Sequence, residues 1–209
     1  MAAVRFAQGS ASWLAATGLG VVALLALALA TGDGVVAALA LAALVFLGFL
    51  LNFFRDPDRA IADGVCSPAD GVVSFVEPAE GGATRVAIFM NPFDVHVNRA
   101  PVAGRIAAVD HRAGGFVPAF KKESERNERV EWVIETAEGP VRLHQIAGTV
   151  ARRIVPYLAP GAEVAKGDRI GMIRLGSRVD VWLPAAYEVK VKGGERVWAG
   201  ATTLAISRK

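Results

Sequence analysis

The chain begins with two long apolar runs that are separated by a short polar tip. Residues 12–31 and 35–54 are each 20 residues long and carry no charged side chain. At about 1.5 Å per residue, a helix of this length crosses a hydrocarbon core of roughly 30 Å. Gly32-Asp33-Gly34 between the runs breaks the helix and adds a charge. The pattern predicts an N-terminal transmembrane hairpin, in preference to two helices buried in a soluble core.

From residue 55 onward, the apolar residues fall in short β-branched runs bounded by Gly, Pro or Asn. These runs predict strands at 71–76, 85–90, 104–109, 130–135, 141–154, 169–174, 178–183 and 188–192. A Pro-x-x-Gly phrase precedes a strand at both 68–71 and 101–104, and residues 160–171 have the glycine spacing of lipoyl- and biotinyl-like sandwiches. We therefore expect a mainly β chain: a membrane hairpin over 1–54, then a β domain over 55–209 that resembles a barrel-sandwich hybrid.

Charges near the two apolar runs indicate their orientation. Arg5 precedes the first run, Arg55 and Arg59 follow the second, and the tip between them carries only Asp33. The positive-inside rule then places both ends, and with them the β domain, on the cytoplasmic side of the cell membrane. A cleaved signal peptide is a weaker alternative, because a second apolar run follows directly.

Composition narrows the classes of partner. Hydrophobic residues make up 53% of the chain and the mean hydropathy is +0.39, which agrees with a membrane segment. Of 23 basic and 20 acidic residues, only Arg5 and Asp33 precede residue 55, so the β domain carries 22 and 19. This mild excess suits anionic lipid headgroups but does not predict nucleic-acid binding. The single Cys66 excludes an internal disulfide and a multi-cysteine zinc site, and we expect it to be a buried filler.

Candidate chemistry is concentrated around one histidine and one serine. His96 lies between Asp94, Asn98 and Arg99, a density of polar residues greater than a turn requires, whereas His111 and His144 are interpreted as packing or surface residues. The sequence shows no spacing of a metal site, no phosphate-binding loop and no nucleophile elbow. Gly176-Ser177, between two predicted strands, is either an ordinary turn or a site of backbone self-processing.

Five phrases, in order along the chain, resemble the short form of phosphatidylserine decarboxylase. They are Ser-Pro-Ala-Asp-Gly at 67–71, Asn-Pro-Phe-Asp-Val-His-Val-Asn-Arg-Ala-Pro-Val-Ala-Gly at 91–104, Asn-Glu-Arg at 127–129, Gln-Ile-Ala-Gly-Thr-Val-Ala-Arg-Arg-Ile at 145–154 and Leu-Gly-Ser at 175–177. The resemblance covers roughly residues 50–209 and implies a pyruvoyl enzyme that makes its own cofactor.

In such an enzyme, the Ser177 hydroxyl attacks the carbonyl of Gly176, and the ester eliminates and hydrolyses to leave a pyruvoyl group at residue 177. The products would be a large chain, 1–176, and a small chain, 177–209, which stay together as a heterodimer that could form higher oligomers. The pyruvoyl group forms a Schiff base with the serine headgroup and takes the electron-sink role of pyridoxal phosphate, so neither that cofactor nor a metal is expected.

The resemblance also implies roles for particular residues. His96 would be the base of self-cleavage and the proton donor of decarboxylation, and Asp70 would be the carboxylate that orients it. Longer bacterial relatives carry a second histidine where this chain has Arg99. Further candidates for substrate binding or support are Asn98, Arg99, Asn127, Glu128 and Arg129.

The expected reaction converts phosphatidylserine to phosphatidylethanolamine and CO₂ at the membrane surface. Two alternatives remain at this point: a non-enzymatic lipoyl- or biotinyl-like adaptor on a membrane tether, and a decarboxylase of another serine-headgroup lipid, such as an ether lipid. The adaptor accounts for the sandwich pattern, but Met172 has no neighbouring lysine to be modified.

Overall fold

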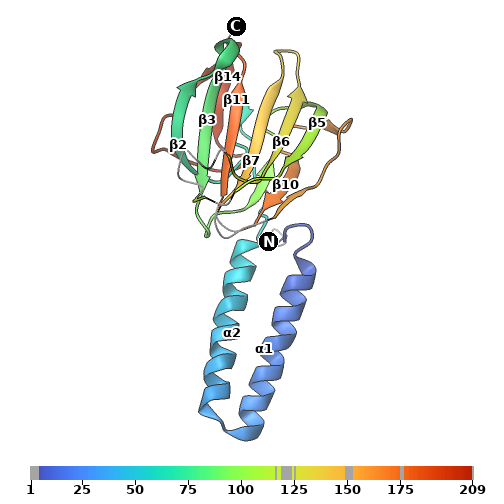
Figure 1. The fold of residues 1–209 in the computed structure, drawn as a ribbon, viewed down its shortest axis with the longest axis vertical. Helices are drawn as coiled ribbons and strands as arrows, with labels where there is room; N and C mark the ends of the chain where they lie inside the picture. The colour runs from blue at the N-terminus through green and yellow to red at the C-terminus, as the bar shows by residue number, and fades with distance from the viewer. Residues whose placement is uncertain are drawn as a thin grey trace. The chain divides into compact units, whose positions relative to one another are not determined.

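The computed structural model describes residues 5–115, 117–118, 124, 126–148, 153–174 and 177–208. The chain divides into two compact units, Met1–Asp58 and Arg59–Lys209, which are considered separately. The first unit is helical and the second is built from β-strands (Figure 1). The mainly β fold with an N-terminal helical hairpin is therefore confirmed.

The first unit is an antiparallel pair of helices, α1 (Ala11–Thr31) and α2 (Gly34–Phe53) (Figure 1). Gly32 ends α1 in the left-handed conformation at φ 66°, which glycine adopts without steric cost. The Asp33 carboxylate then caps α2 by accepting from the amide of Val35 at 2.7 Å. Both helices are long and apolar enough to cross a membrane, and most of their large apolar side chains are exposed.

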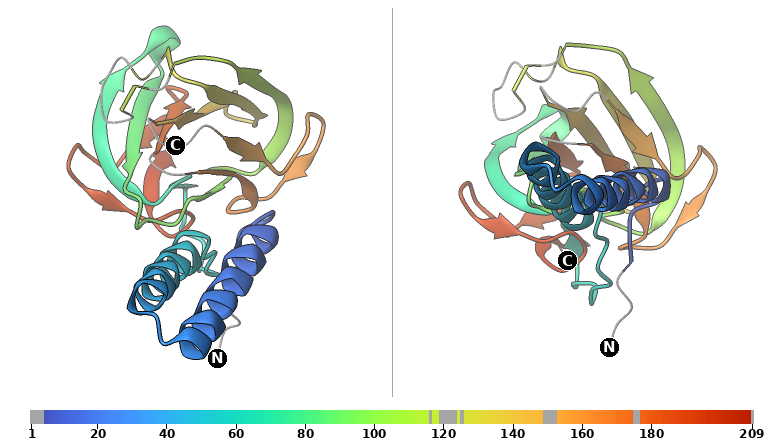
Figure 2. Two further views of the ribbon diagram at one scale, coloured as in Figure 1. Left: turned by 60° about the horizontal axis from the view of Figure 1, so that its bottom comes forward. Right: turned by 90° about the horizontal axis from the view of Figure 1, so that it is seen from below.

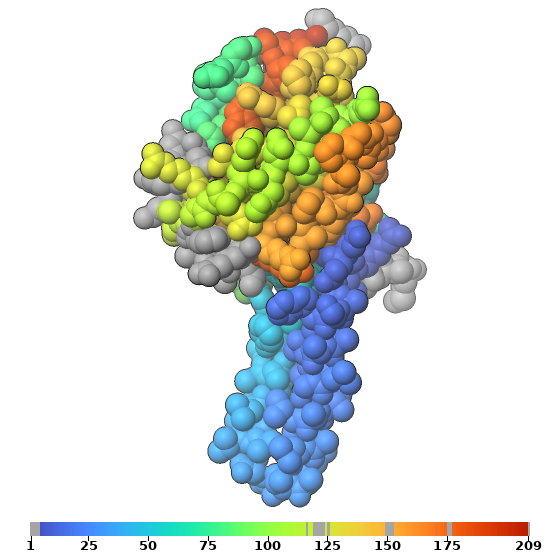
Figure 3. Space-filling model, turned by 45° about the vertical axis from the view of Figure 1, so that its right-hand side comes forward, coloured from blue at the N-terminus to red at the C-terminus, as the bar shows by residue number. Residues whose placement is uncertain are grey.

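The second unit contains one large antiparallel sheet. Its strand order is β13-β2-β3-β11-β7-β6-β5-β9. The strands are β2 (Gly71–Pro78), β3 (Thr84–Met90), β5 (Gly104–Arg112), β6 (Arg129–Glu135), β7 (Val141–Ala147), β9 (Glu163–Val164), β11 (Ser177–Leu183) and β13 (Arg196–Val197). Figure 2 shows how the sheet curves around the interior, and in Figure 3 the segments of β5 and β9, distant in sequence, lie side by side on one face.

Two three-stranded sheets complete the unit. One has the order β4-β10-β8 and the other β1-β14-β12. Their strands are β1 (Val65–Cys66), β4 (Val97–Arg99), β8 (Ile154–Pro156), β10 (Arg169–Ile173), β12 (Tyr187–Val189) and β14 (Thr203–Ser207). The strand predicted over 141–154 is wrong in extent, because β7 ends at Ala147 and β8 begins at Ile154 in another sheet.

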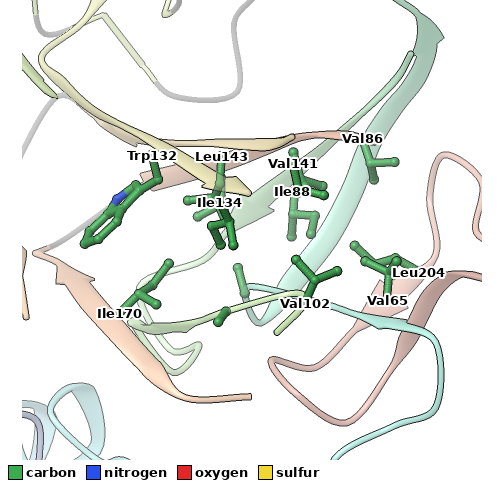
Figure 4. Close-up of a cluster of buried hydrophobic side chains, with 14 of the residues drawn as sticks. Val65, Val86, Ile88, Val102, Trp132, Ile134, Val141, Leu143, Ile170 and Leu204 are labelled. Atoms are coloured by element: carbon green, nitrogen blue, oxygen red, sulfur yellow. The ribbon is translucent and has the colours of Figure 1, made fainter. Parts of the chain in front are cut away.

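The core lies between the large sheet and the two small ones (Figure 4). Trp132, Ile134 and Leu143 from the large sheet, Ile170 from β10 and Leu204 from β14 are all fully buried. Cys66 is also buried, as predicted, and burial raises the pKa of its thiol to about 11. The side chains are thus sorted by strand alternation, which turns every second residue toward the core.

Candidate active site

Two connections between sheets run together at the site. The segment after Met90 leads from β3 to β4, and the segment after Ile173 leads from β10 to β11. Met90 pairs with Ser177, and Val97 pairs with Met172. The amide of Ile173 donates to the carbonyl of His96 at 3.3 Å. Because the strands that flank the two connections are paired, His96 and Ser177 lie in the same part of the fold.

Ser177 is the first residue of β11 and is fully buried. It pairs with Met90 of β3 and Ala147 of β7, so it begins a central strand of the large sheet. Its side chain lies on the same face as Val179 and Val181, which belong to the core. Its hydroxyl donates to the thioether sulfur of Met90 at 3.3 Å. Gly176, the other half of the predicted cleavage site, lies outside the described residues.

His96 is held in one tautomer. The ring is fully buried, and its Nδ1 lies 2.9 Å from the backbone carbonyl oxygen of Asp94. A carbonyl oxygen only accepts hydrogen bonds, so Nδ1 carries a hydrogen, and in the neutral ring the lone pair lies on Nε2. This is the form in which an imidazole can act as a base.

The turn before His96 is fixed by the Asp94 side chain. Its carboxylate accepts from the amide of Asn91 at 2.7 Å and forms an ion pair with Arg196 of β13. The amide of Asp94 in turn donates to the carbonyl of Asn91 at 2.8 Å. The carbonyl that orients His96 is therefore anchored to two other parts of the unit.

The contacts of Asp70 are with residues other than His96. Its buried carboxylate forms a two-point ion pair with Arg59 and accepts from the amide of Ala199 at 2.8 Å. Neither partner is His96, whose Nδ1 faces the Asp94 carbonyl instead. Among the described contacts, Asp70 is an anchor between the start of β2 and the segment after β13.

Two of the other candidates are buried structural connectors. Arg99 donates to the carbonyl of Gly167 at 3.0 Å. The Asn127 amide donates to the carbonyls of Val117 at 2.6 Å and Ala147 at 2.7 Å, and Ala147 is the strand partner of Ser177. Asn127 thus ties its loop to the strand beside Ser177.

Glu128 and Arg129 take different positions relative to Ser177: the Glu128 carbonyl accepts from the amide of Ala147, the strand partner of Ser177, at 2.9 Å, whereas Arg129 faces away. Glu128 pairs with His111 at 3.0 Å. Arg129 is in register with Ile146 and Arg178, which puts it on the opposite face of the sheet from Ser177. There it helps to line a cavity of about 180 Å³ with Arg85, His144, Ile146, Asp180 and Trp182.

Sequence reasoning did not single out three residues that contribute to the site. Met90 contacts the Ser177 hydroxyl, Gln145 donates to Asn98 at 2.8 Å, and Trp132 donates to Gln145 at 2.8 Å. Gln145 begins one of the phrases that resemble the decarboxylase family. Met90 and Trp132 are apolar strand residues in the sequence, so only the register of the folded sheets brings them to this place.

Comparison with known proteins identifies the family. The family model of phosphatidylserine decarboxylase matches residues 46–205. The chain belongs to this family. A phosphatidylserine decarboxylase proenzyme of Streptomyces griseus is 53% identical over 202 residues, which are 96% of this chain and 93% of the relative. A proenzyme of the same name from Thermobifida fusca is 52% identical, over 96% and 92% of the two chains.

Another relative carries a different substrate in its name and matches over nearly the full extent of both chains at a lower identity. A protein of Methanosarcina barkeri, provisionally named an archaetidylserine decarboxylase proenzyme, is 44% identical over 97% of this chain and 99% of its own length. Membership in the phosphatidylserine decarboxylase family makes the chain a decarboxylase and removes the non-enzymatic adaptor as an alternative.

Proposed function

We propose that the chain is a self-cleaving proenzyme that decarboxylates phosphatidylserine to phosphatidylethanolamine and CO₂. The observation that carries this proposal is the position of Ser177, a buried hydroxyl at the start of a central strand, in the same part of the fold as a buried histidine whose Nδ1 is held by a carbonyl. The proenzyme names of the relatives support cleavage, and the family supports decarboxylation.

Self-cleavage begins at the Ser177 hydroxyl. His96 Nε2 takes the hydroxyl proton, and the oxygen attacks the carbonyl carbon of Gly176. The bond between that carbon and the Ser177 nitrogen breaks, the nitrogen takes up a proton, and an ester remains. Loss of the ester by β-elimination leaves a dehydroalanine at 177, and water then replaces the nitrogen, which departs as ammonia. The result is a free carboxylate at 176 and a pyruvoyl group at 177.

The described residues fit such a group at 177. The position is fully buried between β3 and β7, and the Ser177 hydroxyl donates to the weak acceptor sulfur of Met90. The pyruvoyl carbonyl, when present, supplies an electron sink for decarboxylation of an amino-acid headgroup. His96, protonated again from water in each turnover, then gives a proton from Nε2 to the carbon that has lost CO₂.

Supporting roles follow from the contacts. Asn127 holds the strand beside Ser177, and Arg99 fixes β4 to the turn at Gly167. Asp70, anchored by Arg59, acts in this proposal as a negative charge that stabilises the His96 imidazolium through space and not by direct contact. Glu128 and Arg129 support the fold around the loop before β6.

The two cleavage products should remain together. The small chain, 177–209, would contain β11, β12, β13 and β14. Of these, β11 pairs with β3 and β7, β13 pairs with β2, and β14 pairs with β1. Every one of those partners belongs to the large chain, so strand pairing would hold the heterodimer without a covalent bond.

We further propose that α1 and α2 cross the cell membrane, with the catalytic unit on the cytoplasmic side. Their length and apolar surfaces support the crossing, and Arg5, Arg55 and Arg59 support the orientation. The hairpin would hold the catalyst at the lipid surface, which raises the effective concentration of substrate.

The Methanosarcina relative favours a second candidate substrate, an ether-linked serine lipid. Release of CO₂ from vesicles that contain either phosphatidylserine or archaetidylserine tests both. We expect release from phosphatidylserine vesicles at the higher kcat/KM. If CO₂ is released only from archaetidylserine, that lipid is the substrate instead of phosphatidylserine. If a cleaved protein releases CO₂ from neither lipid, the decarboxylase proposal is contradicted.

A further inference from the structure

A chain of buried polar side chains ends beside Ser177. It runs from Trp132 on β6 through Gln145 on β7 and Asn98 on β4 to the sulfur of Met90 on β3. All four residues are fully buried. We call these residues the Trp132–Met90 relay. It connects the large sheet with the β4-β10-β8 sheet and reaches the same sulfur atom that accepts the Ser177 hydroxyl.

Trp132 fixes the direction of every hydrogen bond in the relay. Its indole nitrogen can only donate, and it lies 2.8 Å from Gln145 Oε1. Gln145 must therefore turn its Nε2 to Asn98, where it donates to Oδ1 at 2.8 Å. This leaves the Asn98 nitrogen, Nδ2, facing Met90. The orientations of both amides, which diffraction would leave ambiguous, are thus determined by chemistry.

The Asn98 nitrogen is a strong donor beside a weak acceptor. It lies 3.7 Å from the Met90 sulfur, and the Ser177 hydroxyl oxygen lies 3.3 Å from the same atom, so nitrogen and hydroxyl are within about 7 Å of each other. A buried amide donor normally has a full hydrogen bond, because leaving one unmade costs about 1–3 kcal/mol. A donor satisfied this weakly next to a nucleophile points to an acceptor that arises only during the reaction.

We propose that Asn98 Nδ2 stabilises the oxyanion of self-cleavage, and that Trp132 and Gln145 are positioning residues that keep this donor turned toward Ser177. The inference rests on the proposed cleavage at Ser177. As the hydroxyl oxygen forms its bond to the attacked carbonyl carbon, the π electron pair moves to the carbonyl oxygen and the proton passes to His96. The amide hydrogens of Asn98 would donate to that negative oxygen until the carbonyl reforms and the carbon–nitrogen bond breaks.

Gly171 leaves the space that the relay needs. A Cβ at this position would lie 3.1 and 3.2 Å from the two amide atoms of Gln145 and 2.8 Å from the carbonyl oxygen of Val155. The Gln145 amide therefore packs directly on the backbone of β10. Its position is constrained from this side as well as by its two hydrogen bonds.

Gln145→Glu tests the relay, because it keeps the length of the side chain but reverses the direction of the hydrogen bond between residues 145 and 98. A carboxylate can only accept, so Trp132 donates to one oxygen and Asn98 must turn its nitrogen to the other. Asn98 then presents its oxygen to Ser177. We expect cleavage of the full-length precursor, made by cell-free synthesis into lipid nanodiscs at pH 8, to slow about 10²-fold. Leu143→Met, a buried change on the same strand and face, is the matched control and should cleave at the wild-type rate.

The pH profile separates positioning from a loss of packing. At low pH the introduced glutamic acid is neutral and can donate to Asn98 Oδ1, which restores the original direction. The ratio of the Gln145→Glu rate to the wild-type rate should therefore rise as the pH falls. A rate that is reduced by the same factor at every pH would overturn the positioning role.

A second variant keeps the test decisive if Gln145→Glu does not fold. Asn98→Ala removes the donor without adding a charge, and we expect about a 10²-fold slower cleavage at every pH. Circular dichroism checks the fold of each protein. Folded variants that cleave at the wild-type rate would overturn the inference alone, whereas a wild-type chain that stays intact at 176–177 would contradict the proposed function instead.

Discussion

In the proposed mechanism His96 carries the first step of the chemistry, and its hydrogen bond to the Asp94 carbonyl leaves Nε2 as the ring nitrogen that would take the proton. The sequence pointed to His96 through its polar neighbours, and the expected orienting group was a carboxylate. In the structure a backbone carbonyl orients the ring. That contact could not be read from the sequence, because any residue at position 94 has the same carbonyl.

Replacing His96 by alanine should leave the precursor uncleaved on the timescale on which the wild type is processed. A general base contributes about 10²–10⁴-fold to such a step. The matched control is His111→Ala, which removes an exposed histidine that pairs with Glu128. Gel analysis of the full-length and cleaved chains measures both rates, and normal processing of the His96 variant would remove it as the base.

The structural and the electrostatic roles of the Asp70–Arg59 ion pair can be distinguished by replacing one partner at a time. Both Asp70→Asn and Arg59→Met break one buried ion pair, which should lower the melting temperature of each variant. Only Asp70→Asn also removes the negative charge that we propose stabilises the His96 imidazolium. We therefore expect its cleavage to be at least about 10-fold slower than that of Arg59→Met. Equal rates in the two folded variants would make Asp70 a structural anchor only.

His144 makes stability depend on pH. Burial, together with the nearby guanidinium groups of Arg129, Arg142 and Arg85, lowers its pKa from 6.5 to about 4, although Glu131 opposes the shift. The unfolded chain therefore binds the proton more readily, and stability should fall as the pH drops from about 6.5 to 4, by up to about 3 kcal/mol. Thermal melting of the Ser177→Ala variant, which we expect to stay uncleaved, measures this loss.

The control for that effect is His144→Phe. It retains a ring against Trp182, whose centroid lies 4.2 Å from that of His144, but it cannot titrate. Its melting temperature should decline less over the same pH range. An equal decline in both proteins would assign the pH dependence to other groups.

Among the elements, strand alternation and composition were readable from the sequence, whereas pairing between distant strands was not. The apolar runs predicted the bounds of β2, β3, β5, β6, β10 and β11 to within a few residues. The two- and three-residue strands β1, β4, β9 and β13 were missed, because so few residues have no measurable period, and the five-residue β14 (Thr203–Ser207) was missed as well. Two of them matter here, since β4 carries Asn98 and β13 carries Arg196, the partner of Asp94.

Gly171 shows how one strand position controls both packing and the site. Gly171→Ala would place a Cβ 2.8 Å from the carbonyl oxygen of Val155, so backbone atoms must move. We expect a loss of about 1–3 kcal/mol and slower cleavage, because Gln145 is displaced as well. Gly193→Ala is the control, since its Cβ would meet nothing closer than 3.6 Å. We expect Gly171→Ala to have a lower melting temperature and a lower cleavage rate than Gly193→Ala.

For the whole molecule, the family resemblance in the sequence was sufficient to identify a decarboxylase, and the comparisons confirm it. The site is harder to predict at this scale, because it is formed by residues from β3, β4, β6, β7 and β11 that lie up to 87 positions apart, as Met90 and Ser177 do. The same interleaving implies that the catalytic unit must fold as one chain before it is cut.

Denaturing electrophoresis with intact-mass measurement tests self-cleavage most directly. We expect two chains, 1–176 and 177–209, with the small chain lighter by one ammonia than simple hydrolysis would leave it and without an N-terminal amine. The Ser177→Ala precursor should remain a single chain. A catalytically active wild-type protein that stays intact, or a Ser177→Ala protein that is still cut at the same bond, would contradict the proposal that Ser177 is converted into the cofactor.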